Sequence, residues 1–93
     1  MKITIVGLPG TKTQRTIINV QEAATDFGHH LSVDWISNAR TMCAMGVVHT
    51  PSILVDGKLK SSGRIPSVYE ISQWVEAELV DDRITATGTS VSF

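Results

Sequence analysis

The chain has 93 residues, of which 42% are hydrophobic and 18% charged, a composition typical of one small globular domain rather than of a disordered chain. Its 8 basic and 9 acidic residues are scattered, so no charged surface predicts binding to nucleic acid or to an anionic membrane. No apolar run approaches the roughly 20 residues that cross a bilayer, and the strand-like start KITIV differs from an export signal. We therefore expect a cytoplasmic protein.

The first elements predicted along the chain are a strand and an amphipathic helix. Residues 2–6 form a short β-branched run, which is typical of a buried strand. Apolar residues then recur at helical spacing from about Thr13 to Phe27, and Gly28 follows as a stop. Thr11 and Gln14 have the spacing of a capping box, which predicts that the helix starts inside the preceding loop.

A second strand, a short helix and a third strand come next. Residues 31–35 alternate between apolar and polar side chains and predict the second strand. Asn38 can cap a short helix that ends at Gly46. After a break at a Thr-Pro pair, the apolar run SILV at residues 52–55 predicts the third strand.

A hairpin and a final helix complete the predicted domain. Asp56-Gly57 is a two-residue hairpin signal that leads into a fourth strand over residues 58–62. Ser67 and Glu70 form a second capping-box signal ahead of an amphipathic helix. The order is therefore β-α-β-α-β-β-α, in which the first two βαβ steps imply parallel pairing and the hairpin adds an antiparallel edge.

We place the end of the domain at residue 79, so that residues 1–79 form the domain and residues 80–93 a C-terminal tail. Two interpretations of the tail stay open. A disordered segment fits the composition of DDRITATGTSVSF, which is rich in Thr and Ser. A short hairpin or an added strand also fits, because apolar residues occupy alternating positions around Gly88.

The loop VGLPGTKTQ, residues 6–14, has the outline of a phosphate-binding loop. Such a loop needs two glycines that flank four residues, followed by Lys and Ser or Thr, so that backbone N–H groups wrap the phosphate. Here Lys12 and Thr13 are present, but the second glycine is absent and the loop is one residue short. The chain also lacks room for the larger sheet that this chemistry uses. We therefore reject a nucleotide site.

Three segments carry a resemblance to a known family: MKITIVG at the start, GVVHTPSILVDGKLKSSGRIPS in the middle, and the closing amphipathic helix. Over about residues 1–79 they resemble the small thioredoxin-like proteins called redox-active disulfide proteins. The most specific part runs from Gly46 to Pro66. The resemblance implies a thioredoxin-like α/β fold, with a mixed four-stranded sheet flanked by helices, to which this chain adds a C-terminal extension.

In that family the loop after the first strand carries Cys-x-x-Cys, where a helix N-terminus stabilises a thiolate. The matching positions here are Gly10 and Thr13, so the catalytic residues of the family do not carry over. The one cysteine, Cys43, lies on the predicted second helix, where we expect a small core residue, with a catalytic role as the alternative. A single cysteine excludes an internal disulfide and a cysteine-based metal cluster, and we predict neither a metal site nor a cofactor.

The Thr-Pro pair before the third strand matches the family's Thr-Pro, and the resemblance implies a cis peptide bond there. It also implies that the backbone before this proline pairs with an extended substrate, either a peptide or glutathione. A cluster at the facing helix N-terminus could hold an anion such as a carboxylate. We therefore predict a binding site from both segments: Gly10, Thr11, Lys12, Thr13, His49, Thr50 and Pro51. The simpler alternative is a helix start and an exposed loop without a ligand.

The sequence thus predicts a redox-inactive thioredoxin-fold domain that acts as a non-catalytic binding or self-associating module. Its partner would be a protein or a peptide, or a second copy in a homodimer formed through residues 80–93. The alternative is an enzyme, either a thiol-disulfide oxidoreductase or a glutathione-dependent enzyme, that works through Cys43 or through bound glutathione. A third interpretation is a binder of small anions at the start of the first helix.

Overall fold

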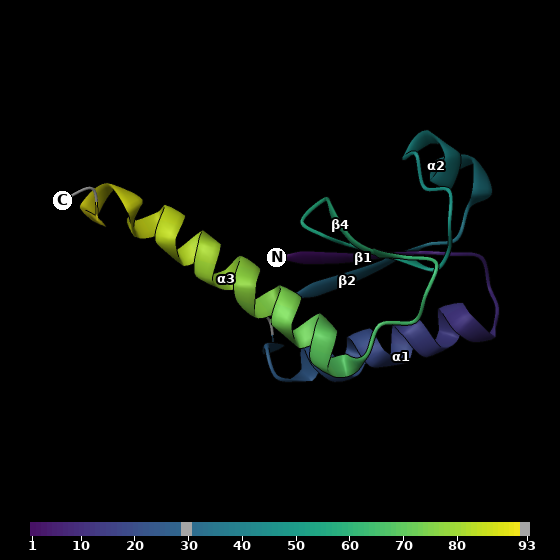
Figure 1. Cartoon of the computed structure of the whole chain (residues 1–93), viewed down its shortest axis with the longest axis horizontal. Helices are drawn as coiled ribbons and strands as arrows, with labels where there is room; N and C mark the ends of the chain where they lie inside the picture. The colour runs from purple at the N-terminus through teal and green to yellow at the C-terminus, as the bar shows by residue number, and fades with distance from the viewer. Residues whose placement is uncertain (29–30, 92–93) are drawn as a thin grey trace.

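The computed structural model describes residues 1–28 and 31–91, and it describes side chains up to residue 79. The elements are β1 (Lys2–Val6), α1 (Thr11–Thr25), β2 (Ser32–Ile36), α2 (Ala39–Ala44), β3 (Ser52–Val55), β4 (Lys58–Ser62) and α3 (Val68–Val91). The predicted order β-α-β-α-β-β-α is confirmed (Figure 1). Within the described residues, no helix is both long enough and apolar enough to cross a bilayer.

The four strands form one mixed sheet in the order β2-β1-β3-β4. β1 is parallel to β2 and antiparallel to β3, so the prediction of parallel pairing is confirmed for the first βαβ step and is wrong for the second. The six residues of α2 span about 9 Å, whereas the five residues of β2 span about 17 Å. α2 alone is thus shorter than β2, and β3 begins at the end of the sheet where β2 finishes.

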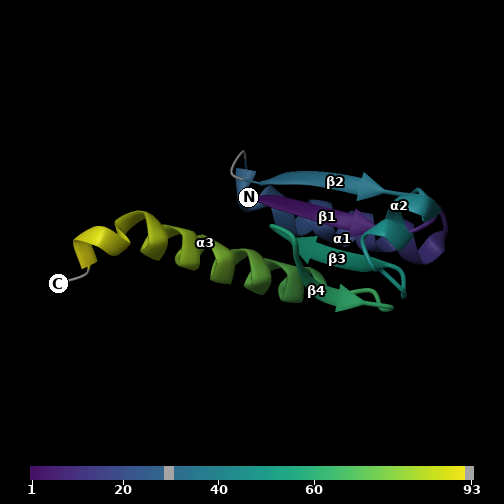
Figure 2. The same cartoon turned by 90° about the horizontal axis from the view of Figure 1, so that it is seen from above.

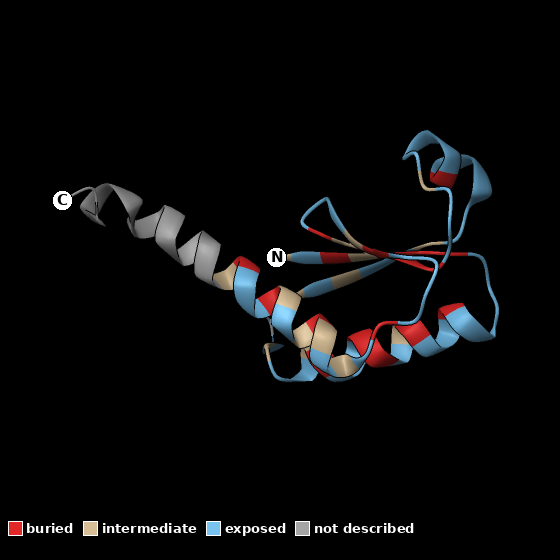
Figure 3. Cartoon of the chain, in the orientation of Figure 1, coloured by how far each residue is buried: buried red, intermediate tan, exposed pale blue. Residues whose placement is uncertain are grey.

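α1 and α3 lie side by side on one face of the sheet, and α2 lies at one end of the opposite face (Figures 1 and 2). Strands and both long helices enclose the main core, and its buried members are Ile3, Ile5, Val20, Ala23, Ile53, Val55, Ile71 and Val75 (Figure 3). β1 and β3 contribute alternate residues, as strand geometry requires. The other face of the sheet is covered by α2 at one end, where the candidate site lies.

Three local sequence signals are confirmed by backbone geometry. Asn38 accepts hydrogen bonds from two backbone N–H groups in the first turn of α2, which caps the helix. Gly46 follows that helix with a φ of 74°, the left-handed conformation that ends helices. Asp56 and Gly57 have φ angles of 49° and 81°, as the predicted two-residue turn between β3 and β4 requires.

The predicted start of α1 is wrong in detail. The helix begins at Thr11 and ends at Thr25, so it lies about two residues earlier than predicted. Gly10 is the N-cap residue, no side chain caps the helix, and the N–H of Gln14 bonds to the carbonyl oxygen of Gly10 at 2.9 Å. Thr11 is already in the first turn, so its hydroxyl cannot cap as a capping box would require.

The last helix is longer than the sequence predicted. α3 continues as helix through Val91, which differs from both the hairpin or added strand and the disordered tail considered for this segment. A helix that has already formed adds one backbone hydrogen bond for each further residue, whereas an added strand needs a partner edge. Residues 92–93 lie outside the described residues, and the division of the chain at residue 79 stays a prediction.

Candidate binding site around Thr50 and Pro51

Gly7 is the residue at which the loop after β1 is fixed to the sheet. Its N–H donates to the carbonyl oxygen of Ile36 at 3.0 Å, and its carbonyl oxygen accepts a hydrogen bond from Nε1 of Trp35 at 2.8 Å. Both partners belong to β2. β2 therefore determines where the loop of residues 7–10 leaves the sheet, and with it the start of α1.

Gly7 also lies close to α1 and to the segment before β3. A Cβ atom added to Gly7 would lie 2.7 Å from Oγ1 of Thr13 and 3.6 Å from Cα of Pro51, and the first distance is too short for any side chain. The structure thus brings two predicted site residues, Thr13 and Pro51, together beside Gly7. We did not predict Gly7 as a site residue, although a glycine at the end of a strand is a signal of close approach.

The predicted site residues at the start of α1 divide into two kinds. Thr13, which the resemblance aligns with the second cysteine of the family's motif, is only 4% exposed and packs against Gly7. Gly10, Thr11 and Lys12 are exposed. Thr13 therefore serves the packing between the loop and α1, and the three exposed residues are the ones that a ligand can reach.

The backbone on either side of Thr50 is held in place. The carbonyl oxygen of His49 accepts hydrogen bonds from two serine hydroxyls, one on β3 and one on β4. The carbonyl oxygen of Pro51 accepts a hydrogen bond from the N–H of Gly63 at 2.9 Å. The Thr50–Pro51 peptide bond is cis, as the resemblance implies. The path of the chain before β3 is therefore set by β4 and by the loop after it.

Thr50 is exposed, whereas Pro51 beside it is buried. Neither the N–H nor the C=O of Thr50 makes a hydrogen bond with another residue in the described part of the chain. Backbone groups of this kind are strong donors and acceptors that an extended chain can use. Thr50 is thus an exposed, unpaired backbone position next to a buried and hydrogen-bonded neighbour.

A pocket of about 260 Å³ lies next to this segment, on the face of the sheet that carries α2. It is lined by residues 45–49 from the loop after α2 and by Ser52, Leu54, Leu59 and Ser62 from β3 and β4. Across the two strands Leu54 pairs with Leu59, and Ser52 pairs with Ser62. The pocket and the Thr50 backbone are adjacent, because the loop that lines the pocket continues directly into Thr50. We did not predict this pocket from the sequence.

Cys43 is exposed, so the prediction that it is a small core residue is wrong. On α2 only Met42 is buried. A six-residue helix makes fewer than two turns and turns only a narrow stripe of its surface toward the sheet. Met42 occupies that stripe, and its neighbour Cys43 faces solvent.

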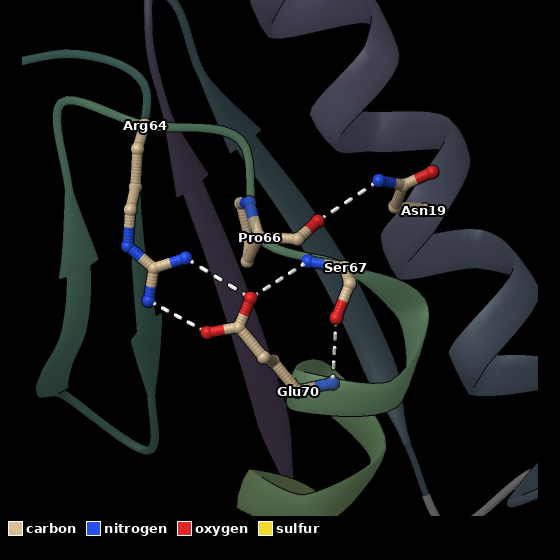
Figure 4. Close-up of polar contacts among 5 residues, drawn as sticks. All are labelled: Asn19, Arg64, Pro66, Ser67 and Glu70. Carbon is tan, nitrogen blue, oxygen red and sulfur yellow. Dashed lines mark hydrogen bonds and ion pairs between the residues drawn. The ribbon is translucent and has the colours of Figure 1, made fainter.

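The loop after β4, residues 63–67, is held by both long helices (Figure 4). On α1, Nδ2 of Asn19 donates to the carbonyl oxygen of Pro66 at 2.9 Å. The guanidinium of Arg64 donates to both carboxylate oxygens of Glu70, on α3, at 3.0 and 2.7 Å. Since this loop supplies the N–H group that holds Pro51, these contacts also help to position the candidate site.

The predicted capping box at the start of α3 is confirmed (Figure 4). The hydroxyl of Ser67 accepts a hydrogen bond from the N–H of Glu70, and the carboxylate of Glu70 accepts one from the N–H of Ser67, both at 3.1 Å. Hydrogen bonds from Arg64 and from the Ser67 backbone lower the pKa of the Glu70 carboxyl to about 2, and Glu70 raises the pKa of Arg64.

A second charged cluster joins β4 to α3. The carboxylate of Glu78 lies 3.2 Å from Nζ of Lys58 and 3.2 Å from Nζ of Lys60, and its side chain is only 6% exposed. Hydrogen bonds from Lys58 and then Lys60 hold the pKa of Glu78 below its ordinary value. A nearly buried carboxylate that is paired in this way fixes the edge strand against α3.

The family model described as a thioredoxin domain matches residues 1–76. No curated protein and no solved structure matches the chain. The matched residues include all four strands and both segments of the candidate site. They contain only one cysteine, so no Cys-x-x-Cys pair is present. The chain therefore belongs to the thioredoxin domain family, as a member that has a single exposed cysteine in place of the dithiol pair.

Proposed function

We propose that the protein is a redox-inactive thioredoxin-fold module that binds an extended segment of a protein partner along Thr50. The observation that carries this proposal is the unpaired N–H and C=O of Thr50 between two neighbours, His49 and Pro51, whose own carbonyl groups are held within the domain. An extended segment that pairs with both groups of Thr50 gains two backbone hydrogen bonds, which is how strand addition provides affinity.

The surroundings of Thr50 support binding at low entropic cost. Its neighbours are fixed by hydrogen bonds to β3, to β4 and to the loop after β4. A site that is already ordered loses little conformational freedom when a partner docks. The conformational entropy lost on binding is then mainly that of the partner. A partner segment that is already extended and exposed before binding loses the least, so we expect a segment of this kind.

The absence of dithiol chemistry in this proposal follows from the residues at the family's two cysteine positions. Thiol-disulfide exchange begins with the attack of a thiolate, and the mixed disulfide that forms is then resolved by a second thiol. Gly10 and Thr13 supply no thiol, and Thr13 is buried. The proposed binding of a segment at Thr50 therefore needs no redox centre in the loop after β1.

Amide hydrogen exchange tests the proposal directly. Peptides selected from a random library for binding to the full chain provide the probe, and the exchange of the Thr50 amide is followed by NMR with and without peptide. We expect exchange at Thr50 to slow by about tenfold or more in the complex, because its N–H becomes hydrogen bonded. The amide of Gly57, an exposed residue at the other end of β3, is the control. A bound peptide that leaves the Thr50 amide unprotected would contradict the proposal.

One observation favours a second candidate function: Cys43 is exposed and is therefore accessible to a disulfide substrate or to glutathione. An oxidoreductase or a glutathione-dependent enzyme that works through this thiol predicts disulfide reduction by the wild-type protein, and loss of that activity in Cys43→Ser. A wild-type protein that is inert toward disulfides and toward glutathione conjugation eliminates this candidate and leaves the binding module.

The partner proposed for the module can also be a second copy of the chain. In that case the full-length protein sediments as a dimer, and truncation after residue 79 gives a monomer. If the full-length and the truncated protein are both monomeric at high concentration, the partner is a different protein.

A further inference from the structure

The two serine hydroxyls that line the pocket beside Thr50 are hydrogen bonded within the domain. The hydroxyl of Ser52 donates to the carbonyl oxygen of His49 and lies 3.1 Å from the hydroxyl of Ser62, which itself donates to the same carbonyl. None of the residues that line the pocket is a lysine, an arginine or a carboxylate. His49 is the one lining residue with an ionisable side chain. A cationic group that entered the pocket would therefore lose its hydration without gaining an anionic partner, which is costly.

The rest of the pocket wall is apolar, and much of it is exposed. Val48 is 82% exposed, Leu59 59% and Met45 40%, and Leu54, which pairs with Leu59 across the strands, is half-buried. Exposed apolar side chains that surround a hollow are typical of binding surfaces. An apolar occupant would remove these side chains from water, which is the main source of affinity in such sites.

The size of the pocket matches one large side chain. A closed cavity of about 150 Å³ with aliphatic walls holds a benzene molecule. The volume of about 260 Å³ found here is larger, and it is partly open to the surface. It accommodates a side chain such as Leu, Met or Phe, whereas an alanine would leave most of it empty.

The pocket wall and the unpaired backbone belong to one stretch of chain. Val48 and His49 line the pocket, and Thr50 follows them directly. In an extended segment successive side chains point to opposite faces, so a segment paired with Thr50 presents every second side chain on the same face. Backbone pairing at Thr50 and insertion of a side chain beside His49 are therefore compatible within one short segment.

From these observations we infer that the pocket recognises one large, uncharged apolar side chain of the partner segment that docks on Thr50. The inference rests on the proposed function and adds the chemistry of the partner: an extended segment with an apolar anchor residue. The backbone hydrogen bonds at Thr50 contribute affinity that does not depend on the sequence of the partner segment. The pocket determines which side chain the segment carries at the anchor position.

A minimal probe tests the pocket without any partner. N-acetyl-leucine methylamide carries the expected side chain between two peptide groups, and N-acetyl-lysine methylamide is the matched charged probe. In a methyl NMR titration of the full chain, the leucine compound should shift the methyl signals of Leu54, Leu59 and Val48, and the lysine compound should leave them unchanged. Equal shifts with both compounds, or no shift with either, overturn the inference.

Variants of the pocket rim test its role in the complex with a selected peptide. Leu59→Glu places a carboxylate at an exposed position of the rim, so the fold has room for it. We expect it to weaken binding about tenfold to a hundredfold, and a peptide with lysine at the anchor position to recover part of that loss. Tyr69→Glu is the matched control, because Tyr69 is a large aromatic residue on α3, 72% exposed, that does not line the pocket.

The outcomes separate the inference from the proposed function. Protection of the Thr50 amide together with full affinity in Leu59→Glu overturns the inference and leaves the proposed function standing. Dependence on Leu59 without protection of Thr50 overturns both, because the occupant is then not a docked strand. Dependence on Leu59 with protection of Thr50 and with selection for an apolar anchor supports both.

Discussion

Nε1 of Trp35 donates a hydrogen bond to the carbonyl oxygen of Gly7 at 2.8 Å. The bond crosses from β2 to the first residue after β1, at the point where the loop turns toward α1. Trp35 is still 41% exposed, so its large ring contributes less burial than a core tryptophan would. Its role in the structure is thus to hold the loop in place.

Replacement of Trp35 by Phe should therefore destabilise the protein by about 1 kcal/mol, because a neutral hydrogen bond is lost while most of the ring contact stays. Urea unfolding followed by circular dichroism measures the change. Tyr69→Phe serves as the control, since it removes a polar group from an exposed aromatic residue on α3 and should change stability by less than about 0.5 kcal/mol. Equal stability of the two variants would show that the Trp35 bond contributes nothing.

Gly7→Ala should be destabilising by about 1–3 kcal/mol, because the new Cβ atom would lie 2.7 Å from Oγ1 of Thr13. The cost should fall when Thr13 is also replaced by Ala, since that change removes the atom in conflict. Four unfolding curves complete this double-mutant cycle. The same cost of Gly7→Ala in both backgrounds would mean that the conflict is with the backbone rather than with Thr13.

The parts of the fold that could be predicted are those that depend on neighbours in the sequence. The turn at Asp56 and Gly57 and the capping box of Ser67 and Glu70 each involve residues no more than three positions apart. Their conformations follow from local backbone preferences and from short-range hydrogen bonds. The order of elements follows from such signals together with the spacing of apolar residues.

The features that could not be predicted depend on residues far apart in the chain. Trp35 and Gly7 are 28 positions apart, and nothing in the spacing of either residue indicates that the indole N–H reaches this carbonyl. The direction of β3 depends on its antiparallel pairing with β1, and the exposure of Cys43 depends on which side of α2 meets the sheet. The pocket is formed by segments that meet only after the sheet has assembled.

The ion pair of Glu70 predicts a specific dependence of stability on pH. The pKa of Glu70 is about 2 in the folded protein and about 4.3 in an unfolded chain. The carboxylate therefore stabilises the fold fully above about pH 5, and this contribution is lost as the pH falls toward 2. Glu70→Gln keeps an acceptor for the Ser67 N–H but loses the charge that pairs with Arg64.

We accordingly expect Glu70→Gln to be less stable than the wild type at pH 7, and the difference to shrink as the pH falls and to vanish below the folded pKa of about 2. Urea midpoints measured at intervals over this range test the expectation. Glu76→Gln, at an exposed position on the same helix, is the control and should follow the wild-type curve. A constant difference between Glu70→Gln and the wild type at all pH values would assign the effect to the shape of the side chain rather than to its charge.

Glu78 predicts a second pH effect with the same sign. Lys58 and Lys60 lower its pKa, so the ionised form stabilises the fold above the pKa of the unfolded chain, and that contribution is lost as the pH falls through the folded value. Glu78→Gln should lower the urea midpoint at pH 7 by more than Glu76→Gln does, because two lysines lose their partner. If Lys60→Met has no effect in the wild type, Lys58 alone accounts for the pairing.

For Ser61 we expect a substitution that raises the stability of the protein, in contrast to the variants above. Among the side chains that the structure describes, its hydroxyl is the one buried polar atom without a hydrogen-bond partner, and it pairs across the strands with the core residue Ile53. Ser61→Ala should therefore stabilise the protein by about 1 kcal/mol, because an unsatisfied hydroxyl no longer has to be buried. Ser52→Ala is the matched variant on β3 and should cost about 1 kcal/mol, because the Ser52 hydroxyl is hydrogen bonded to His49. Urea unfolding of both variants tests the pair, and a loss of stability in Ser61→Ala would indicate a partner for its hydroxyl, such as an ordered water.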